Sequence, residues 1–127
     1  MATGNVTIQG NQSGGPAGSL TFGPLTATTT AAVGSLQVVA LTTGANTITI
    51  PSGTTTCIIT PPNAVNPTPN PTYGGTLTLK GVSGDTGIAI GNKYPQVLEW
   101  DATGGTPSPA TIVINASTGC TVEVWCQ

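Results

Sequence analysis

The chain has 127 residues, which fits a single domain able to bury a core without disulfides or metal. Only 5% of its residues are charged, against roughly 25% in an ordinary soluble domain, and it has no His. Two basic residues cannot form the surface that phosphate binding requires, which excludes nucleic acid as a partner. No apolar run reaches the roughly 18 residues of a membrane span, so we expect no membrane association.

The low charge favours an assembled protein. The formal net charge is −2, and the first charged side chain in the chain is Lys80. A surface of Thr, Ser, Asn, Gln and Gly packs densely against copies of itself or against a partner, because few charges have to be desolvated or matched. The alternative is a secreted or surface domain that tolerates low charge. The stretch MATGNVTIQG has neither a basic start nor an apolar core, so we expect no secretory signal.

Residues 1–18 are rich in Gly, Asn and Gln and predict an N-terminal arm that holds one short strand, NVTI. Such an arm packs poorly on its own domain and can reach a neighbour, through Val6 and Ile8. The alternative is a frayed terminus.

Residues 19–127 predict a single all-β domain. Short runs of β-branched and apolar residues alternate with Thr or Ser, separated by Gly, Pro and Asn, and no segment has sustained helical periodicity. Strands at this spacing indicate a β-sandwich of the jelly-roll type. The connectors 42–46, 51–53 and 117–119 predict hairpins, the last with Gly119 in the left-handed conformation. The expected strands are 19–22, 25–30, 35–41, 46–50, 55–60, 75–81, 86–90, 96–100, 110–116 and 120–126.

A stiff, neutral loop interrupts the strands at residues 61–75, PPNAVNPTPNPTYGG. Successive X-Pro bonds keep the chain extended and without backbone donors. A loop of this length without secondary structure is often functional, and stiffness lowers the ordering cost when it docks. The sequence therefore predicts a contact element here, and an ordinary crossover between sheets is the alternative. The predicted contact residues are Pro67, Pro69, Pro71 and Tyr73.

The three cysteines, Cys57, Cys120 and Cys126, are an odd number, which argues against a closed disulfide framework. Cys120 and Cys126 share one expected strand and lie about 20 Å apart, beyond disulfide reach. Cys57 can pair with either of them across strands. We expect three buried thiols in a reducing cytoplasm.

No constellation of residues carries catalysis. Without His, neither a serine nor a cysteine protease site can form. Glu99 and Asp101 lie two apart on one strand face, as a glycosidase pair could, but two solvated acids at a strand end explain them better. We therefore expect no enzyme, no metal and no cofactor.

The stretch GTLTLKGVSGDTGIAIGNKYPQVLEWD (75–101) and the ending TVEVWCQ resemble the small all-β virion proteins of tailed double-stranded-DNA bacteriophages, and among them the capsid decoration (cement) proteins. The resemblance covers about residues 19–127. It rests on the low charge and the abundance of Thr and Gly more than on specific motifs. It implies a sandwich or jelly roll, often a homotrimer, that binds the outside of the head and stabilises contacts between capsid subunits. The partners are then the major capsid protein and further copies of the chain, on a virion assembled in the host cytoplasm.

A second function remains open, a tail-tip or fibre module that binds a host surface glycan. Exposed aromatic side chains over a shallow polar groove would do this, and Trp100, Tyr94 and Tyr73 are the candidates.

Overall fold

The computed structural model describes residues 2–15, 18–31, 35–65, 70–100 and 108–127. These residues form ten strands and no helix, which confirms the predicted all-β class. The strands are β1 (Ala2–Gly15), β2 (Gly18–Ala31), β3 (Ser35–Leu41), β4 (Gly44–Thr49), β5 (Thr56–Thr60), β6 (Leu77–Lys80), β7 (Ile88–Ile90), β8 (Gln96–Glu99), β9 (Thr111–Ala116) and β10 (Cys120–Cys126).

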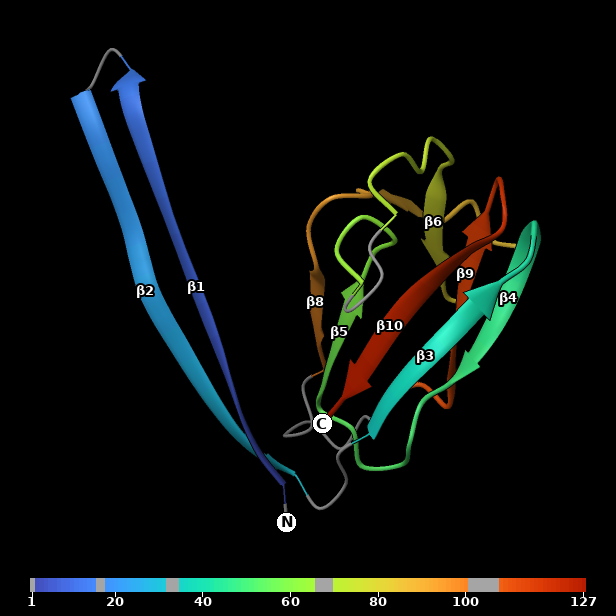
Figure 1. Cartoon of the computed structure of the whole chain (residues 1–127). Helices are drawn as coiled ribbons and strands as arrows, with labels where there is room; N and C mark the ends of the chain where they lie inside the picture. The colour runs from blue at the N-terminus through green and yellow to red at the C-terminus, as the bar shows by residue number, and fades with distance from the viewer. Residues whose placement is uncertain (1, 16–17, 32–34, 66–69, 101–107) are drawn as a thin grey trace.

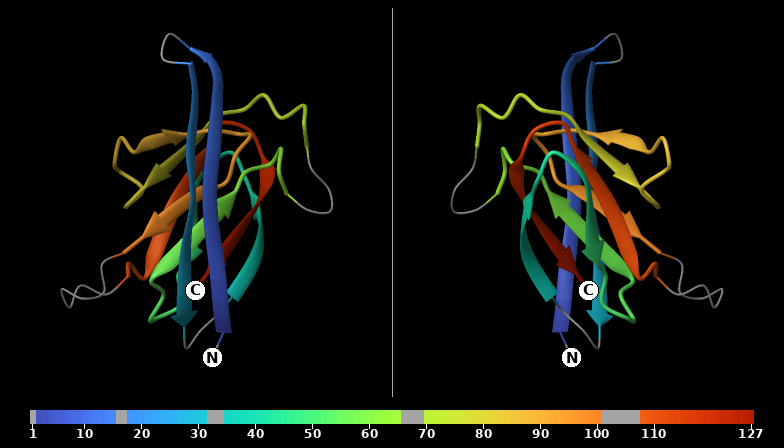
Figure 2. Two further views of the ribbon diagram at one scale, coloured as in Figure 1. Left: turned by 90° about the vertical axis from the view of Figure 1, so that its left-hand side faces the viewer. Right: turned by 90° about the vertical axis from the view of Figure 1, so that its right-hand side faces the viewer.

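Eight of these strands form two antiparallel sheets that pack as a sandwich (Figures 1 and 2). One sheet has the order β3-β10-β5-β8, and the other has the order β4-β9-β6-β7. The pairing is nested, because the first strand of the sandwich pairs with the last, β4 with β9, β5 with β8, and β6 with β7. Two further pairings, β10 with β5 and β9 with β6, complete the sheets.

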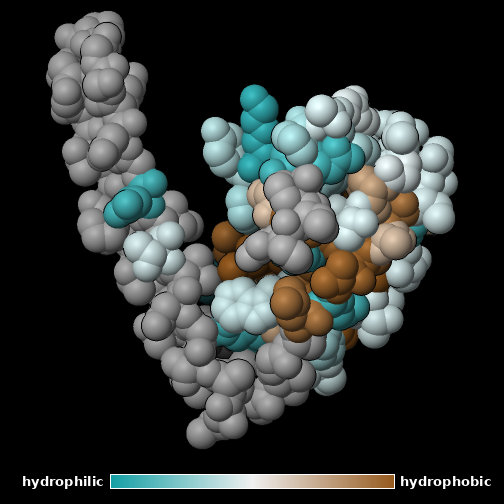
Figure 3. Space-filling model, in the orientation of Figure 1, coloured by the Kyte–Doolittle hydropathy of each residue, from teal (hydrophilic) through white to brown (hydrophobic). Residues whose placement is uncertain are grey.

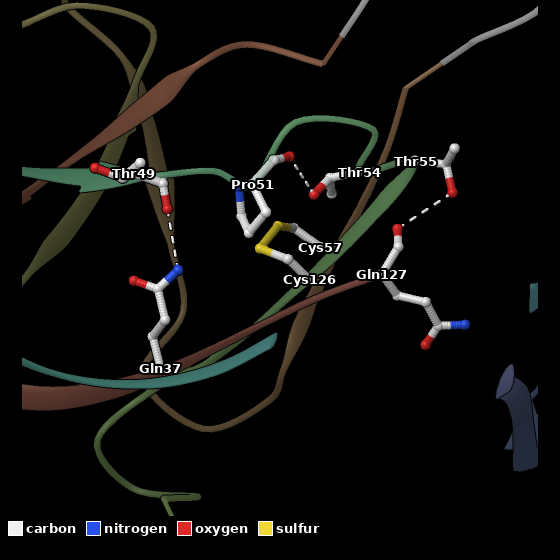
Figure 4. Close-up of a disulfide and its surroundings, with 8 residues drawn as sticks. All are labelled: Gln37, Thr49, Pro51, Thr54, Thr55, Cys57, Cys126 and Gln127. Carbon is white, nitrogen blue, oxygen red and sulfur yellow. Dashed lines mark hydrogen bonds between the residues drawn. A yellow bond between two sulfur atoms is a disulfide. The ribbon is translucent and has the colours of Figure 1, made fainter. Parts of the chain in front are cut away.

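The core lies between the two sheets and follows the period of two that strands impose. In β10 the inward residues are Val122, Val124 and Cys126, as the alternation predicts, and each is almost fully buried. Gln37 on β3 also links the layers, since its side-chain amide donates to the Thr49 carbonyl at 3.0 Å (Figure 4). The other buried members of the core cluster are Leu41, Ile48, Ile50, Cys57, Ile59, Tyr73, Leu77, Ile112, Ile114 and Ala116.

The three predicted hairpins are wrong. The connectors after β3, β4 and β9 each carry the chain from one sheet to the other, and consecutive strands of the sandwich pair only at β6–β7. A short turn is compatible both with a hairpin, in which the next strand pairs in the same sheet, and with a connection that takes the next strand to the other sheet. The burial of one apolar face per strand makes that choice. Left-handed backbone occurs at Gly44, Gly53 and Gly87, and not at Gly119.

β1 and β2 form a long hairpin outside the sandwich. They pair with each other and with no strand of either sheet, and the hairpin extends away from the sandwich (Figures 1 and 2). The expected strands 19–22 and 25–30 are therefore one strand, and the arm boundary predicted at residue 18 falls where β2 begins. Between the pairs Ile8↔Leu25 and Gly10↔Phe22, the two residues Gly23 and Pro24 face the single residue Gln9. That is a β-bulge, a position that accepts proline.

A disulfide joins Cys57 on β5 to Cys126 on β10 and overturns the expectation of three free thiols (Figure 4). The two residues are direct partners in the ladder, with Cα atoms 4.4 Å apart. Next to them, the backbone N–H groups of Thr56 and Gln127 each donate to the other's carbonyl at 2.9 Å. The cysteines therefore occupy a non-hydrogen-bonded pair, in which facing Cα atoms approach most closely. Sequence spacing could not reveal this register.

Candidate functional site

The proline loop is tied to the sandwich at its start. Pro61 and Pro62 are fully buried, and Val65 is buried as well. The Pro62 carbonyl accepts a hydrogen bond from the Asn70 N–H at 2.8 Å, which brings the two ends of the loop tip together. Pro71 is exposed, whereas Pro67 and Pro69 lie outside the described residues. The prediction that these prolines make contacts stays a prediction.

Tyr73 anchors the end of the loop. Its side chain is only 8% exposed, and its hydroxyl donates to the Thr118 carbonyl at 2.9 Å. Burial, with the hydrogen bond to the Cys120 thiol as a second cause, raises the pKa of Tyr73 to about 12. Burial also raises the pKa of Cys120. Tyr73 therefore offers a partner little surface, and it would serve a contact by fixing Pro71 and the neighbouring loop in place.

Gly75 makes room for this tyrosine. A Cβ at Gly75 would overlap the Tyr73 hydroxyl and lie 2.5 Å from the ring carbon that bears it. We expect Gly75→Ala to lower the free energy of unfolding by about 2 kcal/mol, because a packed ring must move. Gly74→Ala is the matched control, since its nearest neighbour is 4.0 Å away. Urea denaturation compares the two, and equal midpoints would show that the ring does not fill this space.

The tyrosine also predicts a loss of stability at alkaline pH. The pKa rises from 10.0 in the unfolded chain to about 12 in the folded protein, so the fold favours the neutral phenol. That stabilisation is complete below pH 10 and disappears as the pH rises from about 10 to about 12. We expect the free energy of unfolding of Tyr73→Phe to fall less than that of the wild type over this interval. Parallel slopes in both proteins would contradict the assignment.

A pocket of about 510 Å³ opens beside the loop and is lined by Asn63, Pro71, Tyr73, Gly91, Asn92, Lys93 and Tyr94. Tyr94 is 74% exposed at its rim. The Asn92 side chain donates to the Gly75 carbonyl at 2.7 Å. The side-chain oxygens of Asn63 and Asn92 are buried and accept no hydrogen bond from the described residues. An exposed aromatic ring at the rim of a pocket with polar walls suits a ligand that carries hydroxyl groups.

The three aromatic residues proposed for glycan binding do not meet. Tyr73 and Tyr94 line this pocket, whereas Trp100 packs against the core and lines a separate pocket of about 410 Å³ with Leu79 and Leu98 among its walls. A groove made by all three is therefore absent from the described part of the chain.

A second surface, which sequence reasoning missed, is an apolar row across the outer face of the β3-β10-β5-β8 sheet. The register aligns one residue from each strand, each facing away from the core: Leu36, Trp125, Ile58 and Val97. Figure 3 shows apolar residues gathered on this face of the molecule. Leu36 is 64% exposed, and its neighbour Val38 is 66% exposed. The signal was the run SLQVVAL, which is apolar on both faces of one strand.

The predicted arm residues Val6 and Ile8 lie in β1, opposite Ala27 and Leu25 of β2. They therefore share one face of the hairpin with those two residues. Their predicted role in an interface is untested by the fold itself.

Protein-family models, curated proteins and solved structures offer no match to this chain. Within the described ranges there is no helix long and apolar enough to cross a membrane, and no group of three or more potential metal-ligating side chains.

Proposed function

We propose that this protein is a structural virion protein that decorates the outside of a bacteriophage head and stabilises contacts between capsid subunits. The observation that carries the proposal is a nearly uncharged sandwich with a long hairpin that pairs with neither of its sheets. An isolated two-stranded hairpin is at best marginally stable in water, so the hairpin needs a further surface to pack on. Attachment to neighbouring subunits provides one.

The sandwich belongs to the jelly-roll type in this proposal. Its support is the nested pairing, in which β3 to β6 run beside β10 to β7 as one long folded ribbon. A ribbon folded in this way distributes eight strands over two four-stranded sheets, as in the double Greek key of viral capsid domains.

The partners in this proposal are the major capsid protein and further copies of the chain, with a trimer expected from the resemblance. The loop residues Pro67, Pro69 and Pro71 and the arm residues Val6 and Ile8 form the contacts. The few charges suit such contacts, because no charged side chain precedes Lys80 and none of the arm or loop contacts requires a charge to be desolvated.

The test is the copy number of the chain in purified particles of the virus that encodes it, measured by quantitative mass spectrometry relative to the major capsid protein. Hundreds of copies per particle are expected for a decoration protein. A handful of copies would indicate a role in the tail instead of the head. Absence from the particles would show that the protein is not a virion component.

A second function, a tail-tip or fibre module for a host glycan, is favoured by the pocket beside Tyr94. Its test is binding of the host surface polysaccharide to the purified chain. If the pocket binds it, Tyr94→Ala weakens binding at least about tenfold by removing the stacking ring, whereas Val82→Ala, an exposed apolar residue elsewhere, leaves it unchanged. Equal binding by both variants excludes this pocket.

A further inference from the structure

We infer that the β1–β2 hairpin of one copy docks on the outer face of the β3-β10-β5-β8 sheet of a second copy, over the apolar row Leu36, Trp125, Ile58 and Val97. The inference goes beyond the proposed function and does not rest on it, because it concerns the purified chain alone. Two unpartnered surfaces on one chain carry it.

The hairpin has two chemically different faces. Paired residues of antiparallel strands share a face, and the faces alternate along each strand. One face consists of Thr and Asn: Thr3, Asn5, Thr7, Thr26, Thr28 and Thr30. The other is predominantly apolar, with Thr29 and Gln12 as its polar members, and its apolar members are Ala2, Val6, Ile8, Leu20, Phe22, Leu25, Ala27 and Ala31. The bulge at Gly23 and Pro24 keeps Phe22 and Leu20 on the same face as Leu25.

The outer sheet face is the matching surface. Its row of apolar residues crosses all four strands, with the half-buried Glu123 beside it on the same face as the partner of Val38. The exposed fractions of Leu36 and Val38 show that nothing in the described chain covers the β3 end of this row. Sheets pack face to face when each presents an apolar surface, at a spacing of about 10 Å. Residues 1–31 contain no charged side chain, so docking them buries no charge from the hairpin.

The length and direction of the hairpin point to a second copy as the occupant. Fourteen residues extend about 46 Å, twice the span of the seven-residue β10. The hairpin diverges from its own sandwich (Figure 1), and Figure 2 shows that it runs past the height of the sheets. When the hairpin of one copy docks on the sheet of another, two different surfaces meet. Such an assembly is closed either when two copies exchange hairpins in a dimer or when several copies form a ring.

Sedimentation equilibrium of the purified full-length chain tests the inference, without capsids. We expect an assembly of two or more copies. Leu36→Lys should raise its dissociation constant at least about tenfold, because docking would then have to desolvate a further charged side chain on this face. Val82→Lys is the matched control, since Val82 is 61% exposed but lies outside this sheet, in the connector between β6 and β7. A monomeric wild type, or equal effects of the two variants, overturns the inference.

The hairpin side has its own matched pair. Ile8→Lys should weaken assembly as Leu36→Lys does, whereas Thr7→Lys, one residue away on the polar face, should not. Equal thermal midpoints of the dissociated chains, measured in dilute solution, separate lost association from lost folding.

Photo-crosslinking identifies the occupant directly. A photoreactive residue replaces Val97 in ¹⁵N-labelled chains, which are mixed with unlabelled ones. Crosslinks from the labelled sheet to unlabelled residues 2–31 support exchange between copies. Crosslinks only within one isotope form would mean that each hairpin folds back on its own sheet, and this overturns the inference. These experiments use the purified chain and no virions. Their outcome is therefore independent of the copy-number measurement that tests the decoration role.

Discussion

Removing the Cys57–Cys126 disulfide is expected to lower the free energy of unfolding by about 4 kcal/mol. The bond closes a segment with a sequence separation of 69, and the loss of unfolded-chain entropy on closing such a loop accounts for a value of this size. Both cysteines are almost completely buried in the core, so the reduced pair adds no compensating solvation in the folded state.

Urea denaturation with and without reductant, supported by the double variant Cys57→Ala/Cys126→Ala, measures this effect. Cys120→Ala is the control, because Cys120 is free and only half-buried. Identical midpoints before and after reduction, with thiol counts verified by mass spectrometry, would contradict the prediction.

The second large effect is expected at Gly87, in the turn between β6 and β7. Its φ of +77° lies in the left-handed region, and a Cβ there would lie 2.6 Å from the Leu79 carbonyl oxygen. The left-handed conformation costs a side chain about 1–2 kcal/mol, and overpacking about 1–3 kcal/mol more. We therefore expect Gly87→Ala to destabilise the protein by about 3 kcal/mol.

Gly84 in the same turn is the matched control, since a Cβ there meets no atom within 4 Å and its φ is not left-handed. Gly84→Ala should stay within about 0.5 kcal/mol of the wild type. Chemical denaturation of the two variants decides the matter, and comparable losses at both positions would show that the turn is not constrained at Gly87.

The sequence predicted the strands of the sandwich better than their partners. The alternation in CTVEVWC identified the buried face of β10, because one-sided burial imposes a period of two. Pairing depends on which faces meet across the core, and no local pattern records that. The turn before β10 consequently predicted a hairpin where the chain crosses between sheets.

For the candidate functional surfaces too, local sequence patterns predicted some features, whereas others depend on contacts between distant residues. Stiffness marked the proline loop, but the burial of Tyr73 follows from the space at Gly75 and from the Thr118 carbonyl, which lies 45 residues away in sequence. The apolar row needs one residue from each of four strands, so it exists only once the register is known. The sequence did not predict the long hairpin, because Gly23-Pro24 is typical of a turn and therefore indicated two separate short strands. In the structure the pair forms a bulge within one strand.

The nested pairing has a kinetic consequence. β10 is an interior strand, and its partner β3 begins 91 positions before the residue it faces, at Ser35↔Cys126. Closing so distant a contact is slow, and folds dominated by such contacts take milliseconds to seconds. The β1–β2 hairpin needs only a tight local reversal, which takes microseconds. In each newly made chain the β1–β2 hairpin is therefore expected to form and open many times before its own sandwich closes, so that it samples its paired state early and becomes stable only once a surface packs on it.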